Sequence, residues 1–116
     1  MHELPTTRDV HRIVLRQAES AGAVRVLSVN LEIGALTDLR DQWVRRYFEH
    51  LSEGTIVEGA QVNIDRVPGV FGCDGCGESF EVDSVLGERL SCPGCGGSKV
   101  TMLSGRAFRV KNIEVL

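Results

Sequence analysis

The 116-residue sequence has no apolar run near the roughly 18 residues of a membrane-spanning helix, and residues 1–10 lack the apolar core of a secretory signal. It has no excess of positive charge, because its net charge is −3, which argues against binding to phosphate backbones. It contains no G-x-x-x-x-G-K-[S/T] nucleotide loop, and no arrangement of Ser, His and Asp stands out as a catalytic triad. These absences favour a cytoplasmic protein that is not an enzyme and binds neither membrane nor nucleic acid.

Cysteine is scarce, and its few positions form two C-x2-C pairs separated by fifteen residues. The four residues are Cys73, Cys76, Cys92 and Cys95. This spacing is typical of a tetrahedral four-thiolate zinc site. Because protein sulfur would fill every coordination position, no place remains for water or substrate, and the predicted Zn(II) is structural.

Two other uses of the cysteines are less favoured. Two disulfides would need an oxidising compartment, for which the N-terminus carries no signal. A thioredoxin-like redox protein needs one C-x-x-C at the end of a strand, and it does not need two.

Apolar periodicity predicts two helices and three strands outside the cysteine region. The expected elements are helices over 6–21 and 40–53, and strands over 24–33, 60–67 and 106–116. Thr6 or Thr7 is expected to cap the first helix, and Gly22 to end it. The alternation of the last strand shifts near Lys111, which predicts a bulge or a change of covered face.

Two amphipathic helices need a sheet on which to bury their apolar sides, and two strands alone are marginal. The strand after the cysteines is the only candidate for a third strand. The predicted fold is therefore α+β: a small three-stranded sheet flanked by two helices, with an inserted four-cysteine zinc-binding domain. Residues 1–69 plus 104–116 form the first domain, and 70–103 form the zinc-binding domain, whose hairpin arms are expected near 78–82 and 99–103.

The three histidines differ in their surroundings. His11 and His50 are interpreted as surface or helix-end residues. His2 combines a terminal amine, a backbone amide and an imidazole, and Glu3 adds an amide nitrogen and a carboxylate. Closely spaced nitrogens suit the flat coordination that Ni(II) and Cu(II) prefer. A chain terminus is by default frayed, so residue chemistry alone leaves His2 open between a metal ligand and a featureless end.

Several segments, in one order along the chain, resemble the HypA/HybF family of nickel metallochaperones that mature [NiFe]-hydrogenase. The opening Met1-His2-Glu3 is similar to the M-H-E start of that family. The other matching segments are Leu31–Leu36, Glu58–Ala60, Val67–Gly69, the two cysteine pairs, Leu103–Arg106 and Arg109–Val115. The resemblance covers essentially the whole chain.

The resemblance implies a nickel-binding domain with transient Ni(II) cargo held at the N-terminus by His2 and Glu3, and Zn(II) on the four cysteines. It implies partners as well: the GTPase HypB and the precursor of the hydrogenase large subunit. Some relatives in the family also serve urease maturation.

One position departs from the family pattern. Some members carry an acidic residue after the first strand that is associated with the nickel site, and the matching residue here is Arg40. The flanking Asp38 and Asp41 are both candidate replacements, and neither is included among the predicted ligands.

The main alternative function is a zinc ribbon that binds nucleic acid or regulates a partner. Within residues 71–103, five acidic side chains stand against two basic ones: Asp74, Glu78, Glu81, Asp83 and Glu88 against Arg89 and Lys99. Phosphate binding normally needs a basic surface, so the charge disfavours this alternative. A thiol oxidoreductase is a third option, and it would require reactive cysteines in the native protein.

Overall fold

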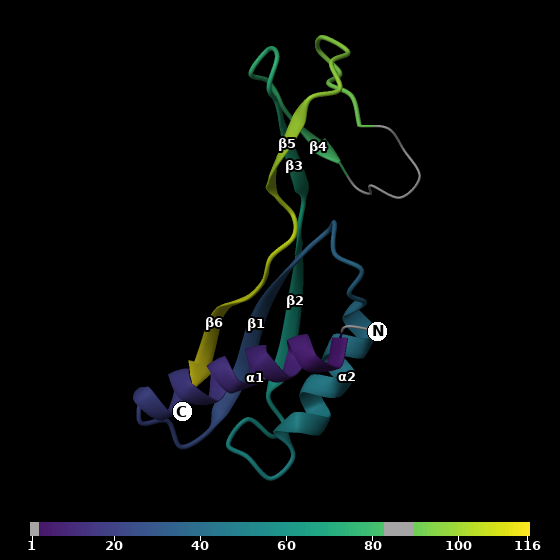
Figure 1. The fold of residues 1–116 in the computed structure, drawn as a ribbon. Coiled ribbons are helices and arrows are strands. Elements are labelled where there is room, and N and C mark those ends of the chain that lie inside the picture. Colours follow the sequence, from purple (N-terminus) through teal and green to yellow (C-terminus); the bar gives the residue numbers. More distant parts are fainter. Residues whose placement is uncertain (1–2, 83–89) are drawn as a thin grey trace. The chain divides into compact units, whose positions relative to one another are not determined.

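The computed structural model describes residues 3–82 and 90–116, which divide into two compact units (Figure 1). Unit 1 comprises Met1–Glu32, Asp38–Asp65 and Phe108–Leu116, and unit 2 comprises Ile33–Thr37 and Arg66–Ala107. The elements are α1 (Glu3–Ser20), β1 (Val26–Gly34), α2 (Asp41–Ser52), β2 (Gln61–Val67), β3 (Gly69–Cys73), β4 (Ser79–Val82), β5 (Val100–Ser104) and β6 (Phe108–Val115). No helix in the described part of the chain is long and apolar enough to cross a membrane.

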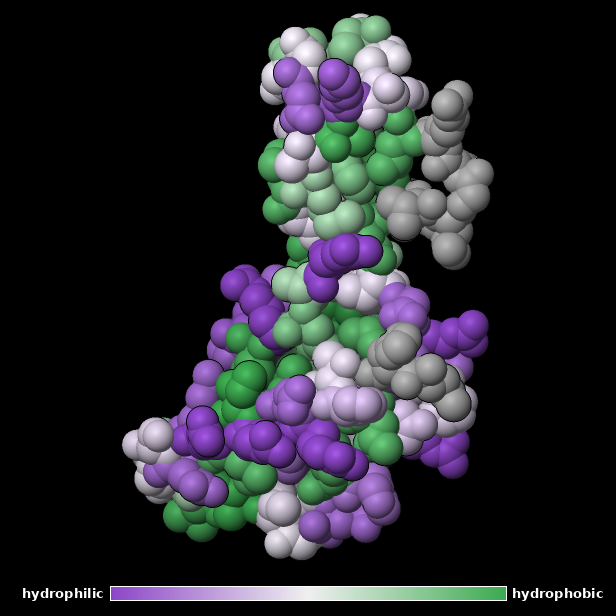
Figure 2. All heavy atoms as spheres, in the orientation of Figure 1, coloured by the Kyte–Doolittle hydropathy of each residue, from purple (hydrophilic) through white to green (hydrophobic). Residues whose placement is uncertain are grey.

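Helix α1 begins at Glu3, so the predicted start near residue 6 is wrong. Thr6 and Thr7 lie within the helix and do not cap it. The residues of α1 that are buried recur every three or four positions: Glu3, Thr7, Val10, His11, Val14 and Ala18. Hydrophilic side chains line the exposed side of the helix (Figure 2). Gly22, with a φ of +66°, follows the helix as predicted.

Helix α2 has Arg40 as its N-cap residue, in an extended backbone conformation and without a side-chain cap hydrogen bond. Thr37, Asp38 and Asp41 have the side-chain chemistry of cap residues, but none of them occupies the N-cap position. Asp41 is instead the first helical residue, where a carboxylate is favoured by the helix dipole. The helix buries Val44, Phe48 and Ser52.

The sheet of unit 1 has the strand order β2-β1-β6, which confirms that the last strand of the chain completes it. The backbone N–H of Leu116 donates to the carbonyl of Arg25 at one end of the pair, and the N–H of Gly34 donates to the carbonyl of Ala107 at the other, so β6 runs antiparallel to β1. Both helices lie against this sheet in Figure 1. Val29 and Leu31 of β1 are fully buried, whereas Leu27, two residues before Val29 in the same strand, is 44% exposed.

The opposite face of this sheet is polar and crosses all three strands. Asn63 of β2 donates to Asn30 of β1 at 2.9 Å, and Asn30 donates to Asn112 of β6 at 2.6 Å. Arg109 pairs with Glu32 at 2.7 Å. Between these two cross-strand pairs β1 advances two residues and β6 advances three, which is the offset that a bulge near Lys111 would produce.

His11 lies at the contact between α1 and α2, so its interpretation as a surface residue is wrong. It is 5% exposed, its Nε2 is 3.0 Å from the Ser52 hydroxyl, and its ring meets Phe48 edge-on at 4.8 Å. The Ser52 hydroxyl donates to the Phe48 carbonyl at 2.7 Å, so it accepts the hydrogen bond from His11. Burial lowers the pKa of His11 below its ordinary value of 6.5.

This lowered pKa makes the stability of the protein depend on pH. Below pH 6.5 the unfolded chain binds a proton that folded His11 does not, so stability is lost as the pH falls from 6.5 toward the folded pKa. The slope from this group is at most about 1.4 kcal/mol per pH unit. We expect His11→Gln, which keeps a donor for Ser52, to flatten the slope in chemical denaturation between pH 5 and 7.

The control is His50→Gln, because His50 is exposed near the end of α2. An unchanged slope in His11→Gln would contradict the assignment.

The sheet of unit 2 has the order β4-β3-β5, and its central strand was not predicted. The predicted hairpin arms match β4 and β5, whereas β3 begins at Gly69, directly after Pro68. Phe71 of β3 pairs with Phe80 of β4, and their rings stack with centroids 6.2 Å apart. Strand β3 ends on Cys73, so the sheet runs directly into the first cysteine turn.

Three glycines of unit 2 lie against one another where its segments begin and end. A β-carbon on Gly34 would collide with the carbonyl of Gly105, and one on Gly69 would lie 2.5 Å from the side chain of Leu36. Gly105 has a φ of +110°, and a β-carbon there would lie 2.6 Å from Cα of Gly69. The close approach of three backbones therefore requires glycine at each position.

We expect Gly34→Ala to destabilise the protein by about 2–4 kcal/mol, because backbone atoms, which relax poorly, stand in the path of the new methyl group. Gly54→Ala is the matched control: it has a φ of +76° and no atoms within 4 Å, so it should cost only about 1 kcal/mol. Equal unfolding midpoints for the two variants in denaturant titrations would contradict the close approach.

Candidate metal centre

The first cysteine pair sits in a tight turn closed by two backbone hydrogen bonds. The N–H of Cys73 donates to the carbonyl of Glu78 at 2.7 Å, and the N–H of Gly77 donates to the carbonyl of Cys73 at 2.9 Å. The N–H of Cys76 points at Sγ of Cys73, 3.4 Å away. Gly77 has a φ of +80°, the left-handed conformation that lets the chain turn back.

The second cysteine pair repeats this turn. The N–H of Cys92 donates to the carbonyl of Gly97 at 2.9 Å. The N–H of Gly96 donates to the carbonyl of Cys92 at 2.7 Å. Gly96 has a φ of +75°, close to that of Gly77. Two equivalent turns therefore face one centre, each contributing two sulfurs.

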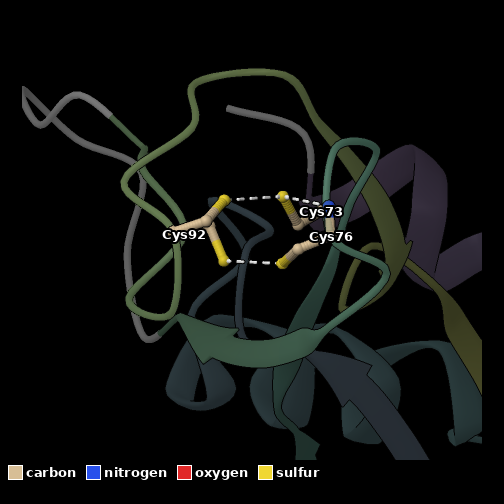
Figure 3. A group of neighbouring side chains, drawn as sticks. Cys73, Cys76 and Cys92 are labelled. Atoms are coloured by element: carbon tan, nitrogen blue, oxygen red, sulfur yellow. Dashed lines mark hydrogen bonds between the residues drawn. The ribbon is translucent and has the colours of Figure 1, made fainter.

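The four sulfur atoms converge, and all lie within 4.8 Å of one another. Sγ of Cys73 is 3.5 Å from that of Cys95, and Sγ of Cys76 is 3.6 Å from that of Cys92 (Figure 3). A tetrahedral ion with metal–sulfur bonds of about 2.3 Å needs sulfurs about 3.8 Å apart. The cluster fits such an ion, whereas a disulfide needs about 2.05 Å between its sulfurs.

The charge balance of the cluster also favours a cation. The backbone N–H of Cys76 helps to lower the pKa of Cys73 to about 7. For Cys76, the N–H of Glu78 favours the thiolate, but the adjacent sulfurs of Cys92 and Cys73 outweigh it and raise its pKa to about 12. Four neighbouring thiols cannot all ionise alone, because thiolates repel. A bound cation removes that repulsion and completes the site.

A polar contact supports the first turn from outside the sulfur cluster. The Thr101 hydroxyl of β5 donates to the Asp74 carboxylate at 2.9 Å, and the N–H of Asp74 donates to the carbonyl of Lys99 at 2.9 Å. Sequence reasoning did not identify these residues, because their spacing carries no motif. The pairing of β3 with β5 brings them together.

The second predicted metal site is only partly within the described residues. His2 lies outside them. Glu3 is 5% exposed, and its Oε2 accepts a hydrogen bond from the backbone N–H of Arg40 at 3.4 Å. Sequence reasoning could not identify this contact, because the donor is a main-chain group that any residue supplies. Arg40 therefore meets Glu3 through its backbone, and the flanking Asp38 and Asp41 both make interactions of their own.

Comparison with known proteins identifies the family. A family model described as hydrogenase/urease nickel incorporation, metallochaperone, HypA, matches residues 1–115. The chain belongs to the HypA family. Hydrogenase maturation factor HypA of Methanothermobacter thermautotrophicus is 40% identical over 99% of this chain and 97% of the relative. Hydrogenase maturation factor HybF of Salmonella typhimurium is 36% identical over 99% of both chains.

Solved structures of HypA proteins share the fold. The solution structure of the Ni metallochaperone HypA from Helicobacter pylori aligns with a TM-score of 0.71 at 21% identity, covering 100% of this chain and 98% of that one. A second HypA solution structure aligns with a TM-score of 0.74 at 20% identity. These matches confirm the predicted α+β fold with a four-cysteine unit, and the family assignment confirms the resemblance read from the sequence.

Removing the metal should expose the cysteines together. We expect a thiol reagent to react slowly with the native protein and then, after a strong chelator is added, to label four thiols for each metal ion released. The measurement is parallel counting of thiols and metal. Fast labelling before chelation, or a requirement for a reductant in place of a chelator, would contradict a metal–thiolate centre.

Proposed function

We propose that this protein is a nickel metallochaperone that carries Ni(II) at its N-terminus and delivers it for maturation of [NiFe]-hydrogenase. The observation that carries the proposal is the family match, which extends from residue 1 to residue 115 and so includes the Met-His-Glu opening. In this role the protein binds and releases an ion and catalyses no reaction.

Nickel is held in the proposal by nitrogens of the chain start: the amine of Met1, the amide and imidazole of His2, and the amide of Glu3. Four nitrogens in this sequence suit the flat geometry of Ni(II). The Glu3 carboxylate has another task, since it is buried against the N–H of Arg40. An open site made by a terminus releases its ion faster than a closed cage, as a carrier requires. Unit 1, which contains α1, is the proposed nickel-binding unit.

Zinc is the proposed ion of the four-cysteine cluster in unit 2. The sulfur spacing supports a tetrahedral ion, and four thiolates are a usual ligand set of structural zinc. Bound zinc would hold the two cysteine turns together. It has no free position for substrate, so it supplies folding energy and no chemistry.

The proposed partners are the GTPase HypB and the precursor of the hydrogenase large subunit, with the cytoplasm as the place of action. The relatives' name, hydrogenase maturation factor, supports a role beside such partners. The family description also names urease, so urease maturation proteins are included among the partner classes. The net charge of −3 speaks against a nucleic-acid partner.

The decisive experiment is a nickel titration of the zinc-loaded protein by calorimetry, with His2→Ala beside the parent. We expect one exchangeable nickel per parent chain and an affinity at least about a hundredfold lower in His2→Ala, because loss of the imidazole breaks the chelate. His50→Ala is the control and should bind as the parent does. Equal affinity in His2→Ala would refute the N-terminal site.

A further inference from the structure

Three arginines form a row along the exposed side of α1. Arg8, Arg12 and Arg16 are four residues apart, so each lies about 6 Å along the helix from the next. All three are exposed, and none takes part in a hydrogen bond or ion pair among the described residues. Hydrophilic side chains mark this side of α1 in Figure 2. We call these three residues the arginine row.

The arginine row is unfavourable for a helix face that meets only water. Like charges four residues apart on a helix repel each other, whereas charges of opposite sign at that spacing stabilise it. Asp9 and Glu19 are the nearest acidic residues on the exposed side, and neither forms an ion pair within the described part of the chain. The chain therefore concentrates positive charge on α1 although its net charge is −3.

Apolar side chains border the arginine row. Leu4, four residues before Arg8, is 37% exposed, and Ile13, next to Arg12 in the sequence, is 46% exposed. A phosphate backbone would pair with the arginines and leave these two side chains uncovered. An amphipathic helix presents carboxylates and apolar side chains side by side, so it matches both features of the surface.

We propose that the exposed side of α1 is a docking surface for an acidic helix of a partner protein. A helix laid along α1 has the same rise per residue, so carboxylates four residues apart fall opposite the three guanidinium groups. A guanidinium and a carboxylate can form two parallel hydrogen bonds, which fix the register of the two helices. Apolar side chains beside these carboxylates cover Leu4 and Ile13. The inference does not depend on the proposed nickel site.

The probe is a synthetic helical peptide in which three glutamates lie four residues apart and leucines flank them. A second peptide has the same composition, with the glutamates in one consecutive run. We expect the parent protein to bind the first peptide more tightly than the second in calorimetry at low salt. Affinity should fall as salt is added, because salt screens exposed charges.

The decisive variant is Arg12→Glu, which replaces the middle charge of the row. We expect its affinity for the first peptide to be at least about tenfold lower, because one ion pair is lost and one repulsion is added. Its denaturation midpoint should stay equal or rise, because the new carboxylate lies four residues from both Arg8 and Arg16. Binding and stability therefore change in opposite directions, so unfolding cannot explain the lost affinity.

The matched control is Arg25→Glu. It makes the same change in net charge at an exposed residue of unit 1 outside α1, and it should bind the first peptide as the parent does. Nickel titrations of Arg12→Glu should also match those of the parent, which separates this surface from the proposed nickel function.

Several results would overturn the docking surface. They are no binding of the first peptide at low salt, no preference for it over the second, equal binding by Arg12→Glu and the parent, or an equal loss in Arg25→Glu. Single-stranded RNA and vesicles of anionic lipid are measured in parallel. Tighter binding of either one, lost in Arg12→Glu, would assign the arginine row to phosphate and refute the acidic helix.

Discussion

Four sulfur atoms within 4.8 Å of one another can all be ionised only around a cation, and unit 2 is organised by that constraint. Its sheet has three short strands, and Phe71 is the only buried apolar side chain of those three strands outside the cysteines. So small an apolar core contributes little stability, which is the usual situation of domains stapled by a metal. The two cysteine turns, at Cys73 and Cys92, compensate for this small core. A tetrahedral ion accepts only one arrangement of its four ligands and so fixes the positions of both turns.

Much of this architecture is readable from the sequence where one local rule acts alone. The cysteine spacing predicted the convergence of the four thiols. Apolar periodicity located both helices of unit 1, because Val10, Val14 and Ala18, and separately Val44 and Phe48, face one core. In each case the spacing of residues in the sequence follows directly from the local geometry of the backbone.

The sequence misled where tertiary contacts replaced local signals. The threonines at the start of α1 have the chemistry of cap residues, yet the helix starts earlier because Glu3 finds its partner in the backbone of Arg40. His11 was interpreted as a surface or helix-end residue because it lies beside the apolar stripe of its helix, but Ser52, 41 positions away, makes its burial tolerable. Strand β3 was not predicted because a Pro-Gly pair usually marks the end of a strand. Here Pro68 follows the end of β2, and β3 begins directly after it at Gly69.

The hydrogen bond from Ser104 to the carbonyl of Pro68 has a consequence for the order in which the chain folds. Strand β6 is synthesised last, about forty residues after β2 ends, and closing so long a loop costs conformational entropy. The pairing of β3 with β5 holds the two ends of unit 2 together, which shortens the effective loop to a few residues and lowers that cost by about 2 kcal/mol. The sheet beside α1 therefore closes at the lowest entropic cost once the strands of unit 2 have paired.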